Sequence, residues 1–117
     1  MTFGKFAYLC LAGFALTTTI PAAAQAQFEG AGEHAELDCD GGVARIEGAS
    51  NVMTVTGRCS QVVIEGADNE VHVELASKGV IHIEGASNRV TWTTPDGSKP
   101  QLRVSGAGNR ISAARGR

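Results

Sequence analysis

The fold is decided by residues 44–73, ARIEGASNVMTVTGRCSQVVIEGADNEVHV, in which one pattern occurs twice. Each half holds a short alternating run, a tetrad of the form Gly-Ala-x-Asn, and a second alternating run. The full tetrads begin and end at Gly48 and Asn51, Gly66 and Asn69, Gly85 and Asn88, and Gly106 and Asn109. A fainter copy, Gly30-Ala31-Gly32-Glu33, lacks the Asn. The glycines of the full tetrads are 18, 19 and 21 residues apart, so the chain is an internal repeat.

Apolar and polar residues alternate on both sides of each tetrad, which is the pattern of half-buried β-strands. The apolar positions before the tetrads are Ala44 and Ile46, Val62 and Ile64, Ile81 and Ile83, and Leu102 and Val104. Those after the tetrads are Met53 and Val55, Val71 and Val73, Val90 and Trp92, and Ile111 and Ala113. We therefore expect one apolar face on both strands of every repeat.

Two strands per repeat predict an all-β fold, a short parallel β-solenoid of about four coils with Gly-Ala-x-Asn bends. Gly at the head of the tetrad permits a backbone angle that a Cβ would penalise. Asn at its end tolerates the left-handed region, and stacked Asn side chains would form an amide ladder. The alternative is an antiparallel β meander or sandwich in which each tetrad is a hairpin turn. The solenoid is favoured because equivalent positions of the repeats carry like residues. Stacked coils place these residues on one another, whereas hairpins do not require the likeness.

The N-terminal stretch has the features of an export signal. Lys5 precedes the apolar run Phe6–Ile20, which ends at Pro21 and a series of small residues. This pattern predicts a cleaved signal peptide over residues 1–26, with cleavage after Ala24 as the alternative. The run of 15 residues is shorter than the ~20 that span a bilayer, so we expect no transmembrane anchor after cleavage. Residues 27–117 would then be a single repetitive β domain, periplasmic or secreted.

Two cysteines, Cys39 and Cys59, remain after the predicted cleavage. In an exported domain they predict one disulfide bond, formed in an oxidising compartment. Closing this loop would stabilise the fold by roughly 3 kcal/mol. The alternative, a two-cysteine metal site, lacks partner ligands at metal-like spacing.

Charge is unevenly distributed along the predicted domain. Residues 27–74 have a net charge of −8 and residues 75–117 a net charge of +5. A solenoid with this sequence would be acidic at one end and basic at the other. The negative total and the export signal argue against nucleic-acid binding.

The run from Leu37 to Ile111 resembles a known family. The resemblance is carried by Asp38-Cys39-Asp40-Gly41-Gly42, by Gly57-Arg58-Cys59 and by the repeated Gly-Ala-x-Asn tetrads. The family comprises short exported bacterial proteins and is numbered 3060 among domains of unknown function. The resemblance implies a cell-envelope or secreted protein and supplies no catalytic residues.

One outward column of acids is a candidate surface feature. Glu29, Glu47, Glu65 and Glu84 each precede a tetrad, and they could bind a cation. We favour instead a solvated edge, in which Arg45, His82 and Arg103 of the adjoining column reduce the repulsion between the acids. The weak metal candidates are Glu47, Glu65, Glu84, His72 and His82, and we expect no metal, cofactor or catalytic site.

The sequence therefore predicts a structural or binding module of the cell envelope rather than an enzyme. Its longest loop, Thr94–Pro100, is too short to build a deep cleft, and its acids are spread along columns. We expect it to associate with itself through its charged ends, or to dock on an envelope component. The alternative is a metal-binding or enzymatic envelope factor that uses the outward Glu and His columns.

Overall fold

The computed structural model of the chain describes residues 25–114, which form strands, bends and loops and contain no helix. None of these residues therefore belongs to a helix long and apolar enough to cross a membrane. The strands are β1 (Gln25–Ala31), β2 (His34–Asp38), β3 (Val43–Ala49), β4 (Val52–Ala67), β5 (Glu70–Ala86), β6 (Arg89–Thr93), β7 (Gln101–Ser105) and β8 (Arg110–Ala113).

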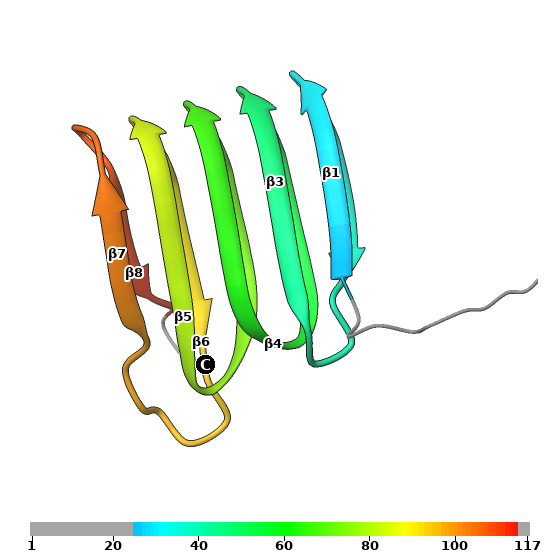
Figure 1. The fold of residues 1–117 in the computed structure, drawn as a ribbon, viewed down its shortest axis with the longest axis vertical. Helices are drawn as coiled ribbons and strands as arrows, with labels where there is room; N and C mark the ends of the chain where they lie inside the picture. The colour runs from blue at the N-terminus through cyan, green and yellow to red at the C-terminus, as the bar shows by residue number, and fades with distance from the viewer. Residues whose placement is uncertain (1–24, 115–117) are drawn as a thin grey trace, which may run out of the picture.

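All pairings between these strands are parallel, and they join equivalent positions of successive repeats. Gly48, for example, lies between Gly30 on one side and Gly66 on the other. The coils follow one another along a single axis (Figure 1). The prediction of a parallel β-solenoid is thus confirmed, and the antiparallel meander or sandwich is excluded.

The solenoid has about five coils rather than about four. The fainter repeat forms the additional coil, because β1 pairs with β3 along its whole length. The coils comprise residues 25–42, 43–60, 61–79, 80–100 and 101–114. A tetrad without its Asn is therefore sufficient at the end of the stack, where no earlier coil has to be bonded.

Each coil has two bends of different character. The tetrad bend is the sharp one, made by Gly-Ala-x-Asn, and it lies at the top of Figure 1. At the opposite side is the round bend, through which β4 and β5 run as continuous strands. The fourth coil has a loop there instead, at residues 94–100, as the sequence predicted.

The tetrad glycine is required for two reasons. Gly48, Gly66 and Gly85 have φ values of 136°, 133° and 141°, a range that side chains rarely adopt. A Cβ at any of them would also overlap the carbonyl oxygen of the preceding coil's glycine. The left-handed φ that we expected of the Asn belongs instead to the residue before it, at 59° in Ser50, Asp68 and Ser87.

The Asn side chains form the predicted ladder inside the tetrad bend. Asn51 donates from Nδ2 to the carbonyl of Gly30, at 3.0 Å, and to Oδ1 of Asn69, at 3.1 Å. Its backbone N–H also donates to Oδ1 of Asn69, at 3.1 Å. Asn69 and Asn88 repeat these three bonds one coil further on. The amides are buried, and the ladder meets their hydrogen-bonding needs.

The inward side chains of both strands form one continuous core. The fully buried members include Ala44, Ile46, Met53, Val55, Val62, Ile64, Val71, Ile81, Ile83 and Val90. Those of the last coil differ, because Leu102 and Val104 are 48% and 44% exposed. They face inward as predicted, but no further coil among residues 25–114 covers them.

The predicted disulfide bond between Cys39 and Cys59 is present, with both residues fully buried. Cys39 follows β2, and Cys59 lies in β4 where the register shifts, so the bond joins the first coil to the second. It thereby fastens the N-terminal end of the stack. Most of the predicted signal peptide, residues 1–24, lies outside the described residues, whereas Gln25 and Ala26 begin β1.

Candidate functional site

Three surfaces hold the residues that the sequence singled out. The Glu face is the outer face of the strands before the tetrads, with Glu29, Glu47, Glu65 and Glu84. The Thr face is the outer face of the strands after them, with Thr54, Thr56, His72, Glu74, Thr91 and Thr93. The open end is the free side of the last coil, with Leu102, Val104, Ile111 and Ala113.

On the Glu face the four glutamates are register partners, so the predicted acidic column exists. Arg45 crosses it, donating from Nε to Glu47 at 3.0 Å and from Nη2 to Glu65 at 2.6 Å. The hydrogen bond to Glu47 and the charge of Glu65 raise the pKa of Arg45 above its ordinary value. Like charges in the column are thus separated by a fixed cation.

In the fourth coil a histidine lies beside the same column. Nε2 of His82 lies 3.1 Å from a carboxylate oxygen of Glu84. Arg103 occupies the corresponding position in the last coil, where its neighbour is Ser105 rather than a glutamate. The Glu face therefore has acids in its first four coils and a basic residue without an adjacent acid in its last.

The metal candidates do not converge. His82 lies on the Glu face, whereas His72 lies on the Thr face, 3.7 Å from Glu70. Across residues 25–114 no three His, Cys, Asp or Glu side chains are placed to hold a metal ion. Glu47, Glu65 and Glu84 share a column, but Arg45 already bonds two of them.

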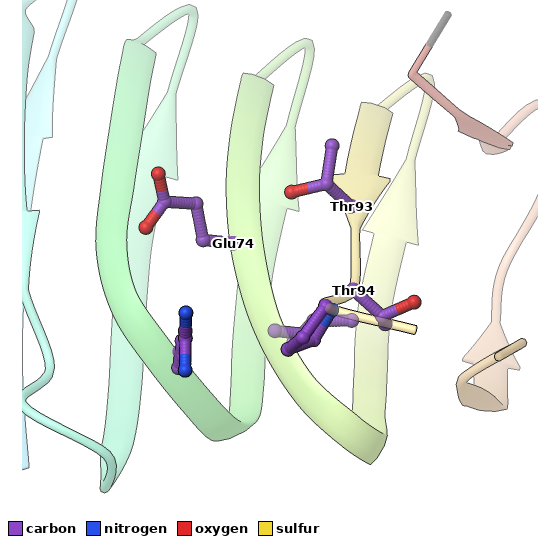
Figure 2. A pocket seen from close by; sticks show the side chains of 6 residues that line it. Glu74, Thr93 and Thr94 are labelled. Carbon is purple, nitrogen blue, oxygen red and sulfur yellow. The ribbon is translucent and has the colours of Figure 1, made fainter. Parts of the chain in front are cut away.

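The Thr face carries shallow depressions rather than a cleft. One, of about 220 Å³, is lined by Arg58, Glu74, Leu75, Thr93, Thr94 and Pro95. Figure 2 shows Glu74, Thr93 and Thr94, which come from neighbouring coils beside the round bend. Oε1 of Glu74 accepts a hydrogen bond from the backbone of Gly57, at 3.3 Å. This bond fixes the carboxylate as part of the bend.

Sequence reasoning did not identify Arg58 or Thr94 as lining residues. The only sequence signal was the pair Gly57-Arg58, which is typical of a turn. In the structure these residues have φ values of 102° and 53°, and the arginine side chain is exposed. Because the depression is open and its carboxylate is engaged by the backbone, it has no recognisable acid–base or nucleophilic arrangement.

The open end is chemically the most unusual surface. Leu102 and Val104 are register partners of Ile81 and Ile83, which are fully buried. The same residue types thus pass from core to surface within one coil spacing, about 4.8 Å. In the part of the chain described, no Asn follows Asn109, so its backbone N–H lacks the amide acceptor that the earlier tetrads have.

The N-terminal end is better covered. Phe28, Ala35 and Leu37 are only partly buried, but the ring of Phe28 and the side chain of Glu33 lie close over Gly30. The disulfide bond closes the round bend of the same coil. The two ends of the solenoid therefore differ in both charge and coverage.

The comparisons with known proteins agree with the resemblance seen in the sequence. No curated protein and no solved structure matches the chain. The model of one family, described as protein of unknown function (DUF3060), matches residues 46–102. These residues run from the second coil to the start of the last and include three of the four full tetrads. Over residues 46–102 the chain is therefore similar to the DUF3060 family of proteins of unknown function.

Proposed function

We propose that the protein is an exported structural or interaction module of the bacterial cell envelope that binds its partner through the open end. The observation that carries the proposal is the exposure of Leu102 and Val104 at the end of an otherwise buried column. A small protein loses solubility by exposing such a pair, and grouped apolar side chains beside free strand edges are typical of interaction sites.

Export is supported by two independent features. The first 26 residues have the charge, apolar run and small residues of a signal peptide. The buried disulfide bond is compatible with an oxidising location outside the cytoplasm. Both features support a location in the periplasm or outside the cell.

The proposal is tested by fractionation and photo-crosslinking in a cell that exports a tagged copy. A photo-crosslinking amino acid is introduced at position 102, and in a control chain at position 54 on the exposed Thr face. We expect the tagged chain in the periplasmic or secreted fraction, with crosslinked products at position 102 and few at position 54. Retention in the cytoplasm, or crosslinks at position 54 alone, would contradict the proposal.

The alternative, a metal-binding or enzymatic envelope factor, depends on the register of Glu47, Glu65 and Glu84. It is less well supported, because Arg45 neutralises the centre of the column. Calorimetric titration of the purified protein with calcium and zinc distinguishes the two. Saturable binding of calcium or zinc that is lost in Glu65→Gln would favour the metal-binding alternative. If neither ion binds, the interaction module remains the better supported function.

A further inference from the structure

We propose that the partner of the open end is the N-terminal coil of a second copy of this chain. Copies would stack head to tail, with β7 of one beside β1 of the next and β8 beside β2. This inference rests on the proposed function, because it names the partner of the same surface. The argument comes from strand edges, register and charge.

The strand edges at the two ends are complementary. Within the described residues, β7 pairs only with β5 and β8 only with β6. Likewise β1 pairs only with β3 and β2 only with β4. Every pairing is parallel, so a second copy shifted along the axis offers its β1 and β2 in the direction that β7 and β8 require. Contact between two identical ends would instead reverse the strands.

The register of the internal coils also fits the junction between copies. Continued by one coil, it sets Phe28 of the incoming copy beside Val104, and Ala26 beside Leu102 in a copy cleaved after Ala24. On the other strand it sets Ala35 beside Ile111. Val104 and Ile111 of the open end thus each meet an apolar side chain, and Leu102 meets one in a copy cleaved after Ala24. Burial of this area is the main driving force that we expect.

Gly30 meets the steric requirement of the junction. At each internal junction the following coil has a glycine, because a Cβ would overlap the preceding glycine's carbonyl oxygen. Gly30 holds that position in the incoming copy, opposite Gly106, although the described part of its own chain has no earlier coil that requires it. Docking requires the side chains of Phe28 and Glu33 to move away from Gly30. It also requires Gly30 to adopt the positive φ of the other tetrad glycines. Glycine permits this change.

Charge favours the same arrangement. Residues 25–40 contain Glu29, Glu33, Glu36, Asp38 and Asp40 and no Lys or Arg. Residues 99–114 contain Lys99, Arg103 and Arg110 and no Asp or Glu. Within the chain, Arg45 donates a hydrogen bond to Glu65 of the following coil. In the junction, Arg103 and Glu29 of the incoming copy occupy the same two register positions and have the same opposite charges. Opposite charges then steer the ends together and fix the register.

One internal hydrogen bond has no counterpart in the junction. Glu33 can accept from the backbone N–H of Asn109, but it has no amide to donate to the carbonyl of Gly106. The junction between copies is therefore weaker than a junction between coils. We expect reversible association that rises with protein concentration and falls with salt.

The test uses the protein purified from the exported fraction, with its N-terminal residue established by mass spectrometry. Sedimentation velocity over a range of concentrations should show a series of oligomers at low salt and mostly monomer at high salt. Leu102→Lys blocks the open end, and Phe28→Asp blocks the N-terminal end. Each should weaken association by about tenfold or more. Thr54→Lys, on the Thr face, is the matched control and should retain the whole series.

Mixing the two blocked variants distinguishes this arrangement from every symmetrical one. Each variant keeps one intact end, so an equal mixture should form a dimer and nothing larger. In the wild type, a photo-crosslinking amino acid at position 104 should attach to β1 of another copy, within residues 27–31. Circular dichroism of each variant as a monomer checks that it is folded.

Three results would overturn the inference: a monomer at all concentrations and low salt, oligomers that Leu102→Lys leaves unchanged, or no dimer in the mixture. A monomer in solution together with crosslinks from position 102 to a different envelope protein would reject self-stacking and keep the proposed function. Absence of all crosslinks at position 102 would reject both.

Discussion

The third coil and the last coil have nearly the same sequence pattern and very different surroundings. Val62 and Ile64 of the third coil are fully buried, whereas Leu102 and Val104 of the last are about half exposed. The difference comes from the number of neighbours, because an internal coil is covered on both sides and the last coil on one. In a solenoid, therefore, burial is a property of the position in the stack rather than of the residue.

The largest expected effect concerns the tetrad glycine, where an internal coil and the first coil differ most. Gly66→Ala places a Cβ on the carbonyl of Gly48 at a φ of 133°, so we expect a loss of at least about 4 kcal/mol or failure to fold. Gly30→Ala meets only the movable side chains of Phe28 and Glu33 and should be mild. Urea unfolding followed by circular dichroism measures both. Equal losses would show that the close approach of the coils is not the cause.

The Asn ladder should show the same contrast at a smaller scale. Asn69→Ala removes four hydrogen bonds from a buried site, and we expect a loss of about 3 kcal/mol in the free energy of unfolding. Asn109→Ala acts where water can replace part of the lost bonds, so we expect about 1 kcal/mol. Denaturant midpoints compare the two. A larger loss at Asn109 than at Asn69 would contradict the assignment of the internal amides as the fully buried ones.

Two valines on the same sheet give a matched measure of coverage. Val62→Ala leaves a cavity in the core and should lower the free energy of unfolding by about 2 kcal/mol. Val104→Ala in the monomer should lower it by less than about 0.5 kcal/mol. Thermal unfolding at a concentration that keeps the protein monomeric separates them. Similar losses would mean that the last coil is covered in solution.

The smallest effect is expected on the Glu face. Arg45 bonds Glu47 and Glu65 at the surface, so Arg45→Gln should lower the melting temperature by only a fraction of the shift in Val62→Ala. The pKa of Arg45 is raised on folding, so from neutral pH upward its contribution is present until strong alkali, where it is lost. The difference between wild type and variant should therefore be constant around neutral pH. A difference that changed across neutral pH would contradict this account of Arg45.

Most of the fold could be predicted because the repeat carries its own register. The tetrads predicted the positions of the bends, and the alternation of apolar and polar residues predicted which side chains face inward. The two cysteines predicted the disulfide bond between the first and second coils. The fifth coil was underestimated, because Glu33 replaces the Asn by which the other copies are recognised. The left-handed residue was assigned one position late, since Ser50 and Asn51 both tolerate that conformation and only the ladder distinguishes them.

The candidate surfaces were less predictable. Their columns follow from the repeat, and the pairing of Arg45 with Glu65 could be expected from adjacency. The exposure of Leu102 and Val104 could not, because an alternating pattern shows which way a side chain faces and not whether another coil covers it. The depression around Arg58 and Glu74 depends on how the round bend turns, and no periodic signal describes that.

The round bend absorbs all the variation in repeat length. From Gln61, Val80 and Gln101, five residues lead to Gly66, Gly85 and Gly106. The extra residues of the longer repeats therefore lie beyond Thr56, Glu74 and Thr93, where one coil passes into the next. One long side of the molecule is consequently held constant by the glycines and amides, while the other is free to diverge. Insertions such as residues 94–100 can accumulate on that side without disturbing the stack, and new recognition loops would arise there.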